Sequence, residues 1–242
     1  MAVATALPPG ERFLVSEIYP TIQGESSLVG YPTVFVRLYS CNLRCAWCDS
    51  MHAVEGTAYE EQSVIEVVRR VVELAASGIS HVCWTGGEPV LQWRAMASAI
   101  RKMPEHLVHS VETDGEVPLA PLSGAVPERR ADGRLRYIMD VKCPGSKMRA
   151  NVAFENLPHL QREDEVKFVI LDRTDYEFAR DVMRSRTIPA GTILFSPAAP
   201  AHAVKEGLDP ATLAAWILKD GLDVRLQIQV HKVLWPGVDR GI

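Results

Sequence analysis

Short apolar runs rich in β-branched residues recur along the chain, and each has a length that suits one strand of a sheet. Turn-forming residues or helical patterns separate them. The predicted strands are Phe13–Ile18, Thr33–Tyr39, His81–Trp84, Leu107–Glu112, Tyr137–Lys142, Val166–Leu171, Thr192–Phe195 and Val224–Val230.

Apolar residues between several of these strands recur with the period of a helix, as at Val64, Val67 and Val71. The predicted helices are Ser63–Ala76, Leu91–Met103, Thr174–Ser185 and Pro210–Lys219, the last of which follows Asp209 as its N-cap. Helices and strands alternate from residue 62 onward. This alternation predicts a parallel sheet with helices on its outside.

Polar and glycine-rich motifs come directly after four of the predicted strands. They are Thr85–Pro89, Glu112–Gly115, Lys142–Ser146 and Ser196–Pro197. Because the loops after parallel strands meet at the carboxyl-terminal edge of a sheet, we expect the functional residues to gather at that edge.

Length and composition indicate one globular domain. The chain has 242 residues, of which 47% are hydrophobic and 23% charged, and a single core extends to ~200–250 residues in folds of this class. The net charge of −4 and the isoelectric point near 6.0 are unfavourable for binding phosphate backbones. Nucleic acid is therefore not expected as a partner.

The first ten residues lack a basic segment followed by a long apolar one, and no ~18 apolar residues stand together anywhere in the chain. We therefore expect a cytoplasmic protein without membrane contact. Residues 1–11 are expected to be a flexible N-terminus of a single domain that covers residues 1–242. The segment 116–134, rich in proline, glycine and charge, is expected to be an inserted surface loop or small subdomain.

Three of the five cysteines stand within eight residues, as Cys41-Asn-Leu-Arg-Cys45-Ala-Trp-Cys48, directly after a predicted strand. This crowding argues against a disulfide framework and favours reduced thiols. Three thiolates suit zinc, cuprous copper or an iron–sulfur cluster, and His52 is near enough in sequence to be a fourth zinc ligand. Three ligands would leave one iron of a cubane cluster open for a small molecule.

The cysteine loop resembles the cluster loop of the radical S-adenosylmethionine superfamily, and Gly86-Gly87-Glu88-Pro89 resembles the second motif of that superfamily. The resemblance implies an incomplete parallel α/β barrel, similar to a TIM barrel, that holds a 4Fe-4S cluster. It also implies that S-adenosyl-L-methionine binds the open iron and is cleaved to a 5′-deoxyadenosyl radical. Taken alone, Glu88 would be interpreted as a carboxylate at a helix N-terminus.

Further motifs resemble the 7-carboxy-7-deazaguanine synthase family over roughly residues 12–235. The motifs are Ile22-Gln-Gly-Glu25, Phe35-Val-Arg-Leu38, Cys48-Asp-Ser50, Glu112-Thr-Asp-Gly115, Asp140-Val-Lys142 and Gln227-Ile-Gln-Val-His231-Lys232. The resemblance implies ring contraction of 6-carboxy-5,6,7,8-tetrahydropterin to 7-carboxy-7-deazaguanine, with loss of ammonia, in queuosine and deazapurine biosynthesis. It further implies Mg²⁺, a homodimer, and an electron donor such as flavodoxin or ferredoxin.

The same resemblance assigns roles to single residues, and the only reacting group it implies is a radical derived from the cofactor. It implies cluster ligands Cys41, Cys45 and Cys48, and a magnesium ligand at Ser50, where the family usually has Thr. The implied S-adenosylmethionine contacts are Trp47, Asp49, Gly86, Gly87, Glu88, Gly115, Cys143, Pro144, Gly145, Ser196 and Pro197. The implied substrate contacts are Ile22, Gln23, Gly24, Glu25, Arg37, Thr113 and His231.

Several of these positions have plainer explanations. Ser50 is also a common turn-capping residue, and Arg37 taken alone would be interpreted as a strand arginine in a surface salt bridge. Cys143 lies where related chains often have Ser-Pro-Lys, and we expect an inert thiol or one that faces the ligand there, rather than a fourth cluster ligand. Cys83 is expected in the core.

Two alternatives of other kinds remain open from the sequence. A glycyl-radical enzyme activase would share the cysteine loop and the small size, but it would act on a protein partner. A non-catalytic zinc or iron–sulfur protein would use the cysteines only to fasten the loop.

Overall fold

The computed structural model describes residues 10–148, 151–201, 203–238 and 240–241. Within these residues nine strands form one sheet in the order β3-β1-β2-β4-β5-β6-β7-β8-β9. The strands are β1 Arg12–Ile22, β2 Pro32–Leu38, β3 Glu60–Ser63, β4 His81–Gly86, β5 Val108–Thr113, β6 Leu135–Asp140, β7 Glu165–Ile170, β8 Thr192–Pro197 and β9 Arg225–Leu226.

Neighbouring strands from β2 to β9 are parallel, whereas β1 is antiparallel to both β2 and β3. The strand order ends with β3 at one edge and β9 at the other, so the sheet is an incomplete barrel, as predicted. The predicted parallel α/β architecture is confirmed.

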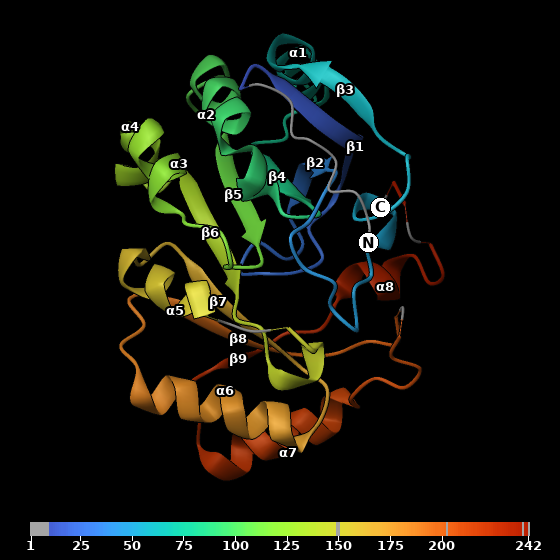
Figure 1. The fold of residues 1–242 in the computed structure, drawn as a ribbon, viewed down its shortest axis with the longest axis vertical. Helices are drawn as coiled ribbons and strands as arrows, with labels where there is room; N and C mark the ends of the chain where they lie inside the picture. The colour runs from blue at the N-terminus through green and yellow to red at the C-terminus, as the bar shows by residue number, and fades with distance from the viewer. Residues whose placement is uncertain (1–9, 149–150, 202, 239, 242) are drawn as a thin grey trace.

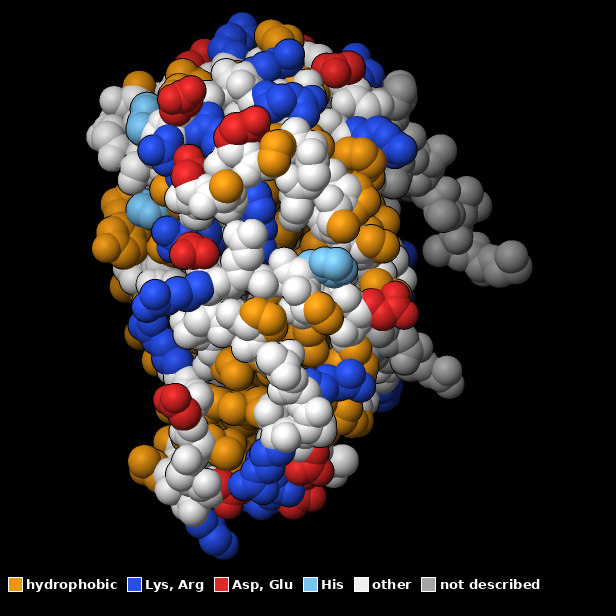
Figure 2. Space-filling view, turned by 90° about the vertical axis from the view of Figure 1, so that its left-hand side faces the viewer, with side chains coloured by type: hydrophobic (Ala, Val, Ile, Leu, Met, Phe, Trp, Pro, Cys, Tyr) orange, Lys and Arg blue, Asp and Glu red, His pale blue; other side chains and the backbone are white. Residues whose placement is uncertain are grey.

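The helices follow the strands and lie along the outside of the curved sheet, except for α8, which lies apart from them (Figure 1). Figure 2 shows Lys and Arg side chains intermixed with Asp and Glu on the face that carries the α3 and α4 side of the molecule, as suits a layer facing water. The helices are α1 Val64–Ala75, α2 Trp93–Lys102, α3 Ala120–Ala125, α4 Pro127–Ala131, α5 Asn151–Asn156, α6 Arg173–Ser185, α7 Pro210–Asp220 and α8 Val230–Leu234.

Local sequence explains where several helices begin. The Ser63 hydroxyl accepts from the Glu66 amide while the Glu66 carboxylate accepts from the Ser63 amide, which is a capping box at the start of α1. The Asp209 carboxylate accepts from the first amides of α7, as its sequence position predicts.

Successive side chains along the inner strands point alternately toward the helices, where they form the core, and toward the interior of the barrel. In β7, Val166, Phe168 and Ile170 are fully buried, whereas Lys167 and Val169 line the cavity on the other face. The core between sheet and helices therefore leaves the barrel interior free for polar groups.

The structure differs from the sequence prediction at the last strand. The run Val224–Val230 was expected to be extended throughout, but only Arg225 and Leu226 pair with β8. The next backbone bond, from Gln227 N to Phe195 O, ends the pairing, and α8 begins at Val230. The alternating pattern arises instead because Gln227 and Gln229 turn toward polar groups of the cavity.

The segment 116–134 contains α3 and α4 rather than an irregular loop. A proline stands in the first turn of each helix, and Leu119, Leu122 and Val126 are almost fully buried. Burial of these three apolar side chains holds the segment against the core, although its composition is typical of a loop. The predicted flexible segment 1–11 falls outside the described residues except for its last two positions.

None of the helices in the described ranges is long and apolar enough to cross a membrane.

Candidate active site

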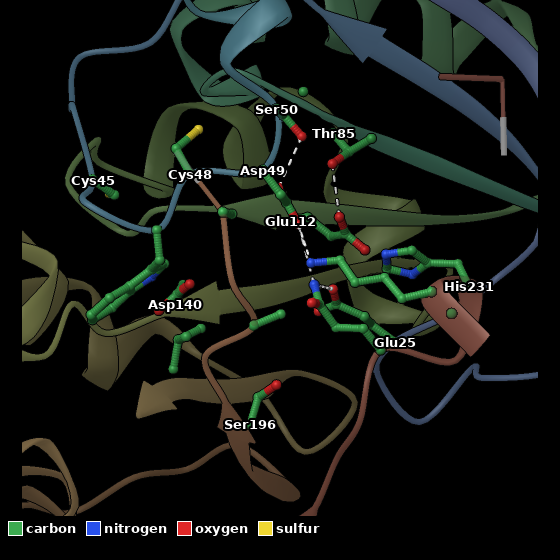
Figure 3. A pocket seen from close by; sticks show the side chains of 18 of the residues that line it. Glu25, Cys45, Cys48, Asp49, Ser50, Thr85, Glu112, Asp140, Ser196 and His231 are labelled. Carbon is green, nitrogen blue, oxygen red and sulfur yellow. Dashed lines mark hydrogen bonds and ion pairs between the residues drawn. The ribbon is translucent and has the colours of Figure 1, made fainter. Parts of the chain in front are cut away.

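A cavity of about 800 Å³ lies at the carboxyl-terminal edge of the parallel strands (Figure 3). The ends of β2, β4, β5, β6, β7 and β8 contribute to its wall, and so do the β1–β2 loop and residues 229–238. Of the residues that the sequence assigned to the site, it is lined by Ile22, Gln23, Gly24, Glu25, Arg37, Cys41, Cys45, Trp47, Cys48, Asp49, Ser50, Gly86, Gly87, Thr113, Ser196, Pro197 and His231.

The cysteine loop forms one side of this cavity. Cys41, Cys45 and Cys48 are free thiols, each partly exposed. The loop is fixed by neighbouring turns, since Ala46 N donates to Ser146 O and Ala46 O accepts from Ala203 N, both at 3.0 Å. Three thiols are thus presented to one cavity on a supported backbone.

Burial raises the pKa of all three loop thiols, and the Asp114 carboxylate adds to the effect at Cys41, whose pKa is about 12. The Cys41 Sγ lies 3.8 Å from Asp114 Oδ2. Among the described residues, no three His, Cys, Asp or Glu side chains are gathered closely enough to hold a single metal ion.

The glycine pair after β4 packs against the backbone that leads into the cysteine loop. Gly87 N donates to Leu38 O, and Glu88 N donates to Ser40 O, both at 2.8 Å. A Cβ atom would lie 2.2 Å from Leu38 O at Gly86 and 2.0 Å from Ser40 O at Gly87. Gly86 also has a φ of +112°. Only glycine fits both positions.

Glu88 lies behind the cavity wall rather than in it, and its contact with S-adenosylmethionine stays a prediction. It is fully buried, and its carboxylate accepts from Val90 N, Asp114 N and Thr113 Oγ1 at 2.6–3.0 Å. Burial and the Asp114 charge raise the pKa of Glu88 well above its usual value. These contacts match the other interpretation of Glu88, a carboxylate at the start of a helix. Its side chain caps the short helix that begins at Pro89.

Four other assigned residues also lie outside the cavity wall. They are Gly115, Cys143, Pro144 and Gly145. Cys143 is fully buried, and Gly145 N donates to Asp175 Oδ1 at 2.7 Å, with the Trp47 ring directly beside it. The turn 143–145 therefore supports Trp47 from behind. Cys83 is buried beside Tyr19 and Phe35, as expected for a core residue.

Arg37 reaches the cavity wall, but it is held by partners of its own. Its Nε donates to Glu17 at 2.6 Å, its Nη1 to Ser50 Oγ at 3.1 Å, and its Nη2 to the Tyr19 hydroxyl. Arg37 therefore does form a salt bridge, but the pair is largely buried rather than on the surface, with the Arg37 side chain 11% exposed and the Glu17 side chain 17% exposed. Ser50 Oγ in turn donates to Asp49 Oδ1 at 3.1 Å.

Acidic and amide groups gather on the side of the cavity opposite the cysteines. Glu112 accepts from Thr85 Oγ1 at 2.7 Å and from Gln23 Nε2 at 3.3 Å. Glu25 accepts from Lys167 Nζ at 3.0 Å and from Gln229 Nε2 at 2.7 Å. This half of the cavity offers several acceptors and donors at fixed positions.

Residues after β9 cover this polar half. The His231 ring packs on Gly24 so closely that a Cβ there would lie 2.2 Å from His231 Nδ1. Val230 N donates to Gly24 O at 3.0 Å, and Lys232 Nζ lies 3.8 Å from Asp49 Oδ2. Trp235 also lines the cavity. The segment 227–238 is thus fastened to both the β1–β2 loop and the cysteine loop.

Sequence analysis did not assign several charged and polar residues that line the cavity. These are Thr85, Glu112, Asp114, Asp140, Lys142, Lys167 and Gln229. Most belong to motifs already noted after strands. Lys167 had a different signal, because this lysine stands between the fully buried Val166 and Phe168 in β7.

Comparison with known proteins agrees with this geometry. The sequence pattern of the Radical SAM superfamily matches residues 36–131, which include the cysteine loop and the glycine pair. The 7-carboxy-7-deazaguanine synthase of Koribacter versatilis is 41% identical over 94% of this chain and 99% of its own length. The chain belongs to the 7-carboxy-7-deazaguanine synthase family.

Other members of this family match at lower identity. The synthase of Chlorobaculum tepidum is 34% identical over 94% of this chain and 96% of its own length. The fold also resembles the crystal structure of QueE from Escherichia coli, with a TM-score of 0.62, 19% identity, and coverage of 90% of this chain and 94% of that one. The fold predicted from the radical S-adenosylmethionine resemblance is thereby confirmed.

The glycine pair generates a prediction about the cysteine loop. Gly87→Ala forces a Cβ into the Ser40 carbonyl, so the loop must shift, and we expect less iron and sulfide bound per chain and a lower Tm. Gly124→Ala in α3 is the matched control, since nothing lies within 4 Å of its Cβ position, and it should be neutral or slightly stabilising. Equal iron content in the two variants would contradict the argument.

Proposed function

We propose that this chain catalyses the ring contraction of 6-carboxy-5,6,7,8-tetrahydropterin to 7-carboxy-7-deazaguanine, with loss of ammonia, on the route to queuosine. The proposal rests mainly on one observation: three cysteines and a cluster of fixed polar groups open into the same cavity. The full-length similarity to named synthases supports it.

The cysteine loop fits a 4Fe-4S cluster. Cys41, Cys45 and Cys48 face the cavity from a supported loop, and three ligands leave a position for S-adenosyl-L-methionine. When bound, the cluster supplies the electron with which the cofactor yields a radical that abstracts hydrogen from the substrate. The chain itself would hold and orient these groups.

The residues beside the cysteines would hold the S-adenosylmethionine. Gly86 and Gly87 leave backbone exposed to the cavity, and the Trp47 ring offers an apolar surface. Asp49, Ser196 and Pro197 line the same part of the cavity. The Ser196 and Trp47 side chains are already almost buried by the rest of the chain. A bound cofactor would cover the small part of each that still faces the cavity.

The polar half would hold the pterin. Glu25 and Glu112 can accept from the N–H groups of its aminopyrimidinone ring, while the Gln23 amide and His231 offer further polar contacts. Arg37 lines the junction between the two halves and would meet the substrate carboxylate with guanidinium N–H groups that Glu17, Tyr19 and Ser50 leave unused.

A magnesium ion would be held at Ser50. The Ser50 hydroxyl and the Asp49 carboxylate supply oxygen ligands, and Mg²⁺ takes few protein ligands together with water and substrate oxygens. Binding there would require Arg37 to give up its hydrogen bond to Ser50. The ion and the freed guanidinium donor would then both face the substrate carboxylate.

The alternatives fit the geometry less well. A zinc protein needs ligands close around one ion, and the described residues contain no such group. An activase needs an open groove for a protein substrate, whereas Trp235, Pro236 and Val238 cover one side of this cavity. A concave site with fixed polar groups on one side favours a small substrate.

Three further properties concern where the protein works, how many chains assemble and what reduces the cluster. We propose that the protein works in the cytoplasm as a homodimer, and that an electron donor such as flavodoxin or ferredoxin reduces its cluster. A low-potential donor is needed because the chemistry begins with a one-electron reduction.

The proposed activity is tested anaerobically with reconstituted, reduced protein, S-adenosylmethionine, magnesium and 6-carboxytetrahydropterin. We expect pterin loss and formation of 7-carboxy-7-deazaguanine by absorbance and mass spectrometry, with little net cofactor consumed. Cofactor cleavage without pterin turnover would refute the proposed substrate and favour the activase.

The cluster assignment is tested by matched cysteine variants. Cys45→Ala removes a proposed ligand, so the absorbance and electron paramagnetic resonance of the cluster should be lost. Cys143→Ala removes a thiol outside the cavity wall, and it should bind a normal amount of iron. Loss of the cluster in the Cys143 variant would instead make that residue a ligand.

The magnesium site is tested at Ser50. Ser50→Ala removes the proposed hydroxyl ligand, and the stimulation of turnover by added Mg²⁺ should therefore weaken. Ser77→Ala, at the exposed end of α1, serves as the control with an unchanged response. A wild-type magnesium response in the Ser50 variant would place the ion elsewhere.

A further inference from the structure

A buried lysine on β7 points into the barrel, and its ammonium meets the carboxylate of the β1–β2 loop. The Lys167 Nζ donates to Glu25 Oε2 at 3.0 Å, and the two side chains are each only 14% exposed. Sequence analysis assigned Lys167 no role. Because charges are costly to bury, such a pair calls for an explanation beyond packing.

Two glutamines complete the surroundings of Glu25. Gln229 Nε2 donates to Glu25 Oε1 at 2.7 Å, and Gln227 Nε2 donates to Glu25 Oε2 at 3.2 Å. The Gln227 Oε1 accepts from Ser26 N at 2.7 Å, so the same side chain also holds the loop backbone. Glu25 therefore has three side-chain donors from two distant parts of the chain, β7 and the segment before α8.

The electrostatics of this group keep the carboxylate charged. Burial alone would raise the pKa of Glu25, but Lys167, the Gln229 amide and the nearby His231 outweigh burial and lower it to about 2. Burial would lower the pKa of Lys167, but Glu25, with Asp140 of β6 and Glu112 of β5, raises it. Both groups are therefore ionised throughout the physiological pH range.

We propose that Lys167, assisted by Gln227 and Gln229, is a positioning residue that holds Glu25 as an oriented anion for the N–H donors of the bound substrate. This inference rests on the proposed function, because it deepens the role of the same cavity. Lys167 acts through Glu25.

The number of acceptor positions supports this role. A carboxylate offers about four lone-pair positions, and Lys167, Gln227 and Gln229 occupy three of them. The carboxylate thus keeps free acceptor capacity while its rotamer is fixed. Gln229 Nε2 also lies 3.2 Å from Asp49 Oδ2, which joins this group to the cysteine loop.

The test measures the KM for 6-carboxytetrahydropterin between pH 6 and 8.5 in four proteins. These are the wild type, Lys167→Met, Lys167→Arg, and Lys219→Met as a control on the exposed side of α7. Met keeps the length of the lysine without its charge, and Arg keeps the charge.

Without the ammonium, burial should raise the pKa of Glu25, so the carboxylate protonates as the pH falls and loses an acceptor. We expect the Lys167→Met KM to exceed the wild-type value by about tenfold or more at pH 8, the scale of one charge-assisted hydrogen bond. The KM ratio should grow toward pH 6, while kcat changes less. Lys167→Arg should restore a nearly flat ratio, and Lys219→Met should match the wild type.

A double-mutant cycle separates this role from a general loss of structure. In a Glu25→Gln background, which already lacks the anion, Lys167→Met should change the KM little. A KM ratio independent of pH, or an equal effect of Lys167→Met in both backgrounds, would overturn the proposal.

If Lys167→Met does not fold, Gln229→Leu provides the second variant, and it should raise the KM by a smaller factor. An unchanged KM in that variant would also count against the proposal. A wild-type protein that does not convert the pterin would refute the proposed function itself, and that outcome is distinct from normal conversion with a flat KM ratio.

Discussion

The close contact of the β4 glycine turn with the end of β2 is the constraint on which the site depends. The Leu38 and Ser40 carbonyls accept from the Gly87 and Glu88 amides, and a Cβ at Gly86 or Gly87 would collide with the same carbonyls. This contact sets where the cysteine loop leaves the sheet. It also places Glu88 so that its carboxylate joins the β4 turn to the end of β5.

The two halves of the cavity are joined at a few points. Asp49, next to the last loop cysteine, meets Gln229 and lies near Lys232, while Glu25 meets the same Gln229 from the other side. A substrate on the polar half would therefore contact groups whose positions depend on the cysteine loop. Radical chemistry needs such a fixed relation between the reacting atoms.

Much of this was predictable from sequence because the information is local. The parallel α/β fold follows from alternating patterns, and the motifs after strands located most of the cavity wall. The contacts of Glu88 behind the cavity wall could not be predicted, because a motif gives the residue type but not which way the side chain turns. The polar contacts of Lys167 depend on the β1–β2 loop, more than a hundred residues away, and no local pattern reveals such a partner.

An incomplete barrel has two open edges, which a closed barrel does not, and unpaired edge strands invite pairing with other chains. At one edge β3 exposes Glu60 and Glu61. At the other, β9 is only two residues long before the chain turns inward at Gln227. The exposed charged side chains at the first edge and the lack of length at the second both discourage sheet-to-sheet aggregation. The turn that brings Gln227 to Glu25 thus also shortens the strand on which a misassembled fibre would grow.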